Sequence, residues 1–185
     1  MNVRLLVAMT VLLSAAAAPA WAGAITILGE SKAARCSEAA LWGRADEKSL
    51  AICDTALMEE PLDQLRRAST FINRGIIHMR RREWEQAHSD FDEALQRKPD
   101  LGEGWVNRGA LMIGTRRFAE GLADTNKGLE LGITEPEKAY FNRAIAYEGL
   151  GDTTAAYYDY SQAVALNPEW DMPKKELTRF TVTRR

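Results

Sequence analysis

The chain has 185 residues, with 24 Lys and Arg against 26 Asp and Glu and 46% hydrophobic residues. This length is sufficient for one domain with its own hydrophobic core. The near balance of charge, a net −2, excludes both a highly charged disordered chain and a strongly basic nucleic-acid-binding protein. The composition therefore predicts a folded domain that does not bind nucleic acid.

Residues 1–22 have the three parts of a secretory signal peptide. Arg4 gives a positive start, residues 5–18 are apolar apart from two hydroxyl residues, and Ala20 and Ala22 place small residues at both recognition positions of a cleavage site. An uncleaved membrane anchor is the alternative, but the apolar run is shorter than the roughly 20 residues that a spanning helix needs. We expect cleavage after Ala22, which would place the protein in the periplasm or outside the cell and leave it without membrane contact.

The next two segments are an extended stretch, residues 23–30, and a helical hairpin, residues 31–67. Each helix of the hairpin carries one of the two cysteines of the chain, Cys36 and Cys53. In an exported protein, such a pair is typical of a disulfide rather than of a metal site or a catalytic nucleophile. Free buried thiols are the alternative. A disulfide would join the two helices of the hairpin.

The rest of the chain is periodic. An aromatic residue, an apolar residue, Asn, Arg and a small residue recur at residues 71–75, 105–109 and 140–144, so that the small residues are 34 and 35 positions apart. A second pattern follows each of these segments, with a small residue first and Asp fourth, at residues 87–91, 121–125 and 156–160. The period predicts three similar units of two helices each.

A 34-residue unit of this pattern resembles the tetratricopeptide repeat, which also has a proline near its end, as Pro99 and Pro168 are here. The units are assigned to residues 68–101, 102–136 and 137–170, and residues 171–185 to a capping helix and tail. The resemblance implies an all-α, right-handed solenoid of helical hairpins. The disulfide-linked hairpin, residues 31–67, would then be a degenerate repeat that reinforces one end of the solenoid.

One acidic residue follows the arginine of each repeat at a constant interval of 16 residues. The three pairs are Arg74 and Asp90, Arg108 and Asp124, and Arg143 and Asp159. Because the interval from the first to the second helix is constant, we expect each pair to meet. We interpret the pairs as structural ion pairs; the alternative is a row of arginines that binds an acidic partner.

An asparagine precedes each of these arginines, at Asn73, Asn107 and Asn142. In tetratricopeptide repeats this face of the first helix lines the concave groove, where Asn can both donate to and accept from a peptide backbone. The same face would carry Ile72, Ile76, Val106, Phe141 and Lys138. For the apolar residues among these, the alternative is packing between neighbouring first helices.

Members of the family that bind chaperones clamp a terminal carboxylate with Lys, Arg and Asn. Here Ile72 and Ile76 stand where that clamp needs Lys and Asn, and Asn142 stands where it needs Arg. A carboxylate clamp is therefore not expected, and the resemblance implies instead a groove for an extended apolar segment or a partner helix. One hypothesis is that the apolar residues 24–28 of the chain itself occupy this groove.

No catalytic motif is evident: the chain has no G-x-S-x-G, no Walker loop and no metal-ligand spacing of His. We expect neither an enzyme nor a cofactor. The resemblance implies a protein-protein adaptor or scaffold of the periplasm or cell envelope. The alternative is an accessory module that binds an anionic envelope polymer or membrane surface through basic connections such as residues 80–82.

Overall fold

The computed structural model describes residues 5–9, 18–20 and 23–184. Within these residues it contains two short strands and nine helices, and the expected all-α solenoid of helical hairpins is confirmed. The helices are α1 (Lys32–Leu41), α2 (Glu47–Glu59), α3 (Gln64–Arg80), α4 (Trp84–Arg97), α5 (Gly102–Gly114), α6 (Phe118–Leu131), α7 (Pro136–Leu150), α8 (Thr153–Leu166) and α9 (Asp171–Leu177). Most of the expected signal peptide, residues 1–4, 10–17 and 21–22, lies outside the described residues.

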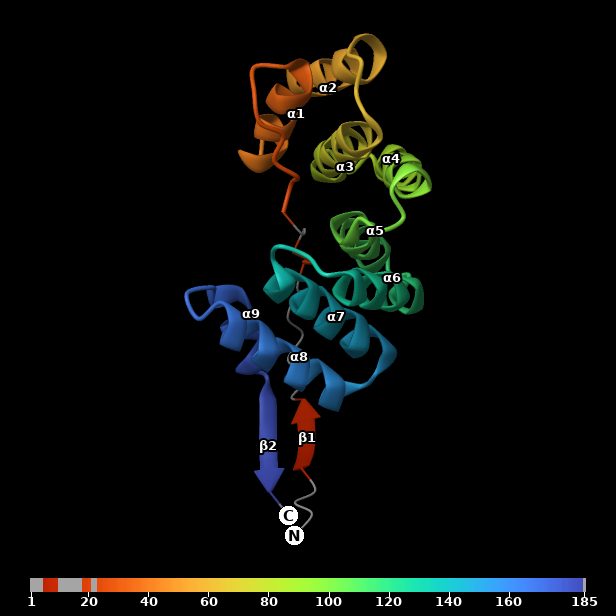
Figure 1. Ribbon diagram of the computed structural model, residues 1–185. Coiled ribbons are helices and arrows are strands. Elements are labelled where there is room, and N and C mark those ends of the chain that lie inside the picture. The colour runs from red at the N-terminus through yellow and green to blue at the C-terminus, as the bar shows by residue number, and fades with distance from the viewer. Residues whose placement is uncertain (1–4, 10–17, 21–22, 185) are drawn as a thin grey trace.

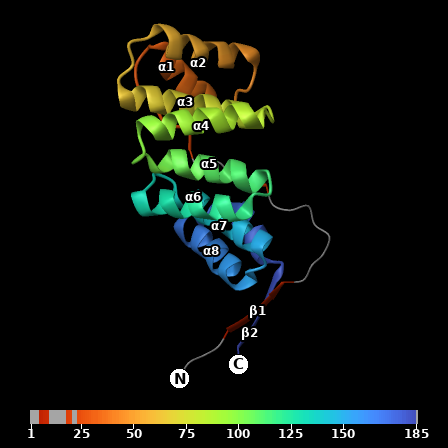
Figure 2. The same cartoon turned by 90° about the vertical axis from the view of Figure 1, so that its right-hand side faces the viewer.

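The hairpins α3–α4, α5–α6 and α7–α8 stack one upon the next, as Figure 2 shows. Small residues at the helix crossings allow this close packing. In the hairpin of α5 and α6, a methyl group placed on Gly128 would lie 2.8 Å from the carbonyl oxygen of Gly102, which is closer than such atoms can approach. The two helices of this repeat are therefore in direct backbone contact.

The hairpin of α1 and α2 covers one end of the stack and packs against α3. Each of its helices begins at a side chain that caps the first turn: Ser31 Oγ accepts from Ala34 N at 3.1 Å, and Asp46 Oδ1 accepts from Ser49 N at 2.8 Å. A disulfide joins Cys36 to Cys53 between the two helices. Both cysteines are fully buried.

The expected boundary at residue 67 falls inside a helix. The backbone N–H of Arg66 donates to Asp63 Oδ1 at 2.7 Å, so Asp63 caps α3 and the helix begins at Gln64. Residues 64–67 therefore belong to the first helix of the first repeat and not to the hairpin before it.

The part of the chain assigned to a C-terminal tail contains a strand. Residues 180–184 form strand β2 (Phe180–Arg184), which pairs antiparallel with β1 (Leu5–Met9), so that Met9 lies opposite Phe180 and Leu5 opposite Arg184. The β-branched residues at positions 181–183 favour this extended conformation. Figure 1 shows that the two ends of the chain meet at one end of the molecule, beyond α7 and α8.

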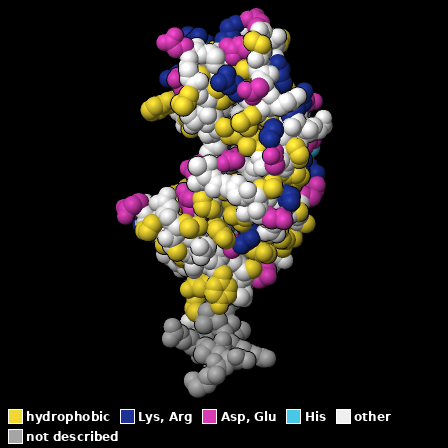
Figure 3. Space-filling model, in the orientation of Figure 1, with side chains coloured by type: hydrophobic (Ala, Val, Ile, Leu, Met, Phe, Trp, Pro, Cys, Tyr) yellow, Lys and Arg dark blue, Asp and Glu magenta, His cyan; other side chains and the backbone are white. Residues whose placement is uncertain are grey.

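None of the helices in the described part of the chain is both long and apolar enough to cross a membrane. In Figure 3, acidic and basic side chains intermingle over the upper part of the visible face, and hydrophobic side chains gather lower down, close to the strands. The visible face therefore carries no extended patch of a single charge.

Candidate functional site

A segment of the chain itself lies along the hollow side of the helical stack. In Figure 1 the described part of this segment that leads into α1 runs down beside α3 toward α5, on the left of these helices. Its described parts are residues 18–20 and 23–30. Two asparagines of the predicted row, on α3 and α7, bind its backbone.

Asn73 of α3 binds Ile25 through both halves of its carboxamide. Its Oδ1 accepts from Ile25 N at 2.9 Å, and its Nδ2 donates to Ile25 O at 2.8 Å. Ser37 of α1 also donates to Ile25 O, at 2.7 Å, and accepts from Ile27 N at 3.1 Å. The backbone of the segment is therefore fixed between the end hairpin and the first repeat.

Asn142 of α7 repeats this arrangement at Ala20. Its Oδ1 accepts from Ala20 N at 2.8 Å, and its Nδ2 donates to Ala20 O. Each asparagine thus satisfies the donor and the acceptor of one peptide residue, as a neighbouring strand would. Such a contact recognises the peptide backbone and does not depend on the side chain of the bound residue.

Asn107 of α5 occupies the same position in the repeat between these two. Its Nδ2 donates to Glu103 O at 2.9 Å, but its buried Oδ1 has no hydrogen-bond partner among the residues that the structure describes. A buried acceptor without a partner costs about 1–3 kcal/mol. Asn107 therefore has one unsatisfied polar atom, whereas both halves of the carboxamides of Asn73 and Asn142 are bound.

The side chains around Ile25 explain why the segment is held here. Ala24 and Ile25 pack against the core that includes Cys36, Cys53 and Ile72. Ile27 is 9% exposed and packs with alanines of α1 and α2. The structure thus places residues 24–27 on the protein's own groove, while the side chain of Leu28 is exposed.

The apolar residues expected in the groove are not exposed. Ile72, Val106 and Phe141 are fully buried and Ile76 is 1% exposed, because neighbouring helices pack against the face that carries them. The four apolar residues therefore do not line an open groove, and the alternative of packing between neighbouring helices applies. Lys138 forms an ion pair with Glu135, with Nζ to Oε1 at 2.6 Å.

Two parts of this site had no signal in the sequence pattern. Ser37 does not fall at the asparagine position of a repeat, since position 39 is the one that lies 34 residues before Asn73. Residues 18–20 were assigned to the signal peptide. A hydrogen bond between segments 122 residues apart, such as that of Ala20 with Asn142, cannot be found from local periodicity.

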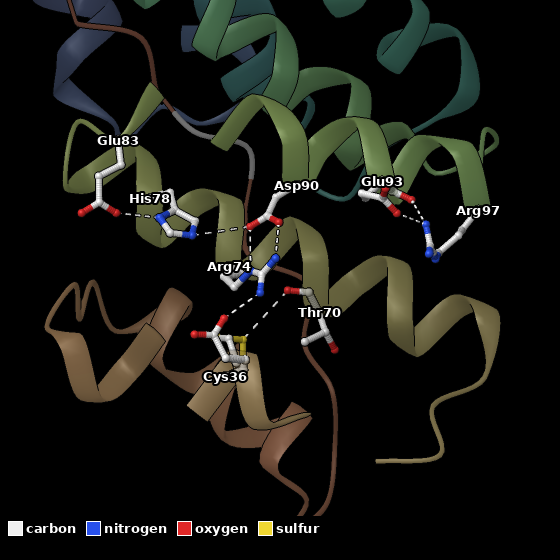
Figure 4. A network of polar contacts seen from close by, with 10 residues as sticks. Cys36, Thr70, Arg74, His78, Glu83, Asp90, Glu93 and Arg97 are labelled. Atoms are coloured by element: carbon white, nitrogen blue, oxygen red, sulfur yellow. Dashed lines mark hydrogen bonds and ion pairs between the residues drawn. A yellow bond between two sulfur atoms is a disulfide. The ribbon is translucent and has the colours of Figure 1, made fainter. Parts of the chain in front are cut away.

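The structure brings together all three Arg–Asp pairs. In the first repeat, Arg74 Nε and Nη2 donate to Asp90 at 2.9 and 2.6 Å, and Nη1 donates to Asp54 of α2 at 2.6 Å. Figure 4 shows this network, which His78 extends by contacts to Asp90 and Glu83. Burial raises the pKa of Asp90, although Arg74 opposes the change.

The same arrangement, with two hydrogen bonds from one guanidinium to one carboxylate, recurs in the next two repeats. Arg108 donates to Asp124 at 2.7 and 2.9 Å, and Arg143 donates to Asp159 at 2.6 and 2.8 Å. The hydrogen bonds that these arginines donate to the carboxylates raise the pKa values of both arginines. Because the three guanidiniums are bound internally, the geometry favours structural pairing over a row of arginines for an acidic partner.

The described residues contain no group of three or more His, Cys, Asp or Glu side chains placed to hold a metal ion. What the site does contain is a row of carboxamides that holds an extended backbone. This arrangement can bind a peptide.

Comparisons with known proteins agree with the fold. Residues 137–170, the range assigned to the third unit, match the family model of the tetratricopeptide repeat. The chain is also 32% identical over 87 residues to an Hsp70-Hsp90 organizing protein of Triticum aestivum. That stretch is 46% of this chain but 14% of the wheat protein, so the chain spans a small part of that relative.

Several solved structures have a similar fold. The tetratricopeptide repeat domain of Arabidopsis OM64 aligns with a TM-score of 0.60 at 21% identity, over 63% of this chain and 96% of that domain. The second such domain of human RPAP3, in complex with an HSP70 peptide, aligns with a TM-score of 0.57 at 19% identity, over 63% and 96%. MamA of Desulfovibrio magneticus aligns with a TM-score of 0.62 at 19% identity, over 80% and 82%. The fold is therefore that of a tetratricopeptide repeat solenoid.

Proposed function

We propose that the chain is a non-catalytic adaptor or scaffold that binds an extended segment of a partner protein in the groove formed by α3, α5 and α7. The observation that carries this proposal is the way Asn73 and Asn142 bind the backbone of the chain's own segment. The similar domain of RPAP3 was solved with a bound peptide, which supports a peptide as the kind of ligand.

The geometry favours recognition of the backbone over recognition of a terminal carboxylate. Ile72 and Ile76 are buried in the stack and offer no positive charge, and Asn142 supplies an amide where a clamp would need a guanidinium. A partner segment would need to be extended where it crosses the asparagines, as Ile25 and Ala20 are. It would not need to end at this site.

We further propose that the protein is exported to the periplasm or cell envelope and that residues 1–22 are removed. The disulfide between Cys36 and Cys53 fits an oxidising compartment. Cleavage after Ala22 would take away Ala20 and leave Asn142 without its peptide, whereas Ile25 would stay on Asn73. The part of the groove open to a partner would then be the part that contains Asn107 and Asn142.

This proposal can be tested with residues 23–185 and a fluorescent peptide of residues 14–22, SAAAAPAWA, by fluorescence anisotropy. We expect the peptide to bind. The substitution Asn142→Ala should weaken binding at least tenfold, because it removes two hydrogen bonds worth about 1 kcal/mol each. Asn73→Ala should leave the affinity unchanged, because Ile25 of the same chain already occupies Asn73.

Circular dichroism of each variant would verify that it is folded. No binding by the wild-type chain, or the same loss of affinity in both variants, would exclude this part of the groove as the site. Export is tested separately, by mass spectrometry of the protein recovered from its native cells. A chain that begins at Gly23 is expected, and one that retains residues 1–22 would contradict removal of the signal peptide.

A further inference from the structure

A cavity of about 510 Å³ lies at the C-terminal ends of α3 and α5, beside the groove. Its volume is within the range of pockets that hold small molecules. Large apolar side chains form most of its walls: Met79, Trp84, Leu111, Ile113, Phe118 and Ile145. Ala18 and Pro19 also line it, so the cavity as described belongs to the chain that retains residues 1–22. None of these residues takes part in the hydrogen bonds that hold residues 20 and 25.

The same cavity is bordered by three arginines and, among its described lining residues, by no acidic side chain. Arg80 donates to Ala40 O at 2.6 Å. Arg82 and Arg116 are exposed, and neither side chain forms a hydrogen bond or an ion pair with any described residue. They differ in this from Arg74, Arg108 and Arg143, whose guanidiniums are bound internally.

The backbone at the two arginines without such a partner is strained. Arg82 has φ 61° and Arg116 has φ 66°, a conformation that favours glycine. The third repeat has Gly151 at the equivalent turn, with φ 84°. Two repeats thus keep an arginine where glycine would fit the turn better, and both arginines lie at the same cavity. Glycine would relieve the backbone strain at both positions.

We propose that this cavity binds a single-chain amphipathic anion, an aliphatic carboxylate of the fatty-acid class. The aliphatic chain lies against Met79, Ile113 and Phe118, where it leaves water, and the carboxylate lies at Arg82 and Arg116. Guanidinium groups bind carboxylates by paired, charge-assisted hydrogen bonds. A concave, mainly apolar wall of this size suits one acyl chain. A net charge of −2 provides no general attraction to an anionic bilayer.

The test is isothermal titration calorimetry of the full chain with decanoate below its micelle concentration. We expect one decanoate to bind per chain. The double substitution Arg82→Gly and Arg116→Gly should weaken this binding at least tenfold, while the melting temperature stays the same or rises. Glycine is what the third repeat carries at this turn, so the variant should fold.

The matched control is Arg35→Gln with Arg44→Gln, which removes two positive charges from exposed positions of the end hairpin. It should leave the affinity for decanoate unchanged. Decyl glucoside, with the same chain and a neutral head, should bind at least tenfold more weakly than decanoate.

Three results would overturn the proposal. They are an absence of decanoate binding, an equal loss of affinity in the two double variants, and equal affinity for the charged and neutral ligands. Binding to phosphatidylglycerol vesicles without binding to decanoate would also overturn it, because the site would then be a membrane surface contact and not a cavity for a single chain.

Discussion

The arginines of the three Arg–Asp pairs, Arg74, Arg108 and Arg143, each donate two hydrogen bonds to one aspartate, but they differ in their third contact. Arg74 and Arg108 each reach a second carboxylate, Asp54 at 2.6 Å and Asp92 at 2.8 Å, on the second helix of the preceding unit. Arg143 reaches the neutral Asn126 at 2.8 Å instead. The charge of Arg143 is therefore balanced here by Asp159, without a second carboxylate.

This difference predicts unequal costs for the same substitution. Asp159→Asn removes the bound carboxylate from Arg143 and should lower the free energy of unfolding by about 3–5 kcal/mol, as expected when one partner of a buried pair is lost. Asp124→Asn leaves Arg108 with Asp92 and should cost about 1.5–3 kcal/mol, the value of hydrogen bonds to a charged group. Urea melts of the two variants measure both costs.

A compensating substitution provides the control. Asn126→Asp would supply the missing second carboxylate, and in the Asp159→Asn background it should recover up to about 1 kcal/mol, because this position is exposed. Equal costs for Asp159→Asn and Asp124→Asn would show that the third contact contributes nothing.

At the scale of elements, the hairpin of α1 and α2 stands at one end of the stack of hairpins. It packs on α3 along one side and has no repeat beyond it, so its helices are covered less completely than those inside the stack. Its disulfide closes a loop between residues 17 positions apart. On a chain-entropy account, a loop of this length stabilises the folded state by about 3 kcal/mol.

We therefore expect Cys36→Ala with Cys53→Ala to lose about 3 kcal/mol of stability, with the loss concentrated in this hairpin. Hydrogen exchange should become faster in α1 and α2 and stay unchanged in α7 and α8. Reductant should destabilise the wild-type chain in the same way and have no effect on the double variant. Faster exchange throughout the protein would mean that the disulfide supports the whole stack.

The period of the sequence was sufficient to predict the elements and the contacts that repeat with them. A constant interval between helices implies that Arg74 and Asp90 meet, and the same interval applies in every unit. Burial was not predictable in this way. A pattern shows which face of a helix carries Ile72 or Phe141, but only the packing of the next helix decides whether that face is covered.

Contacts without a period were also missed. Strand β2 requires β1 as a partner, more than 170 residues away in the sequence, and nothing local in a five-residue stretch indicates that pairing. The third contact of Arg143 was missed for a related reason, since the helix packing that brings Asn126 to it depends on the neighbouring repeat.

At the scale of the whole molecule, the segment before α1 adds contacts between units that are not neighbours in the solenoid. Repeats in a solenoid contact only their neighbours, so their stabilities are nearly independent apart from the shared interfaces. In the chain that retains residues 1–22, the segment before α1 binds Ser37 on α1, Asn73 on α3 and Asn142 on α7. A continuous chain that touches non-neighbouring units should make them unfold together more than stacking alone would.

We therefore expect Ser37→Ala with Asn73→Ala to separate the end hairpin from the stack, even with the disulfide intact. The pair of substitutions removes the four hydrogen bonds that hold residues 25–27, worth about 1 kcal/mol each. Hydrogen exchange in urea should then show α1 and α2 opening at a lower urea concentration than α7 and α8.

Asn107→Ala is the matched control, because Asn107 is equally buried and makes no hydrogen bond to the described part of the segment. If the control separates the two transitions as far as the double variant does, the segment does not couple the repeats. If only the double variant separates them, the segment joins the units into one cooperative structure, and a partner that displaces it from the groove would also loosen the end hairpin.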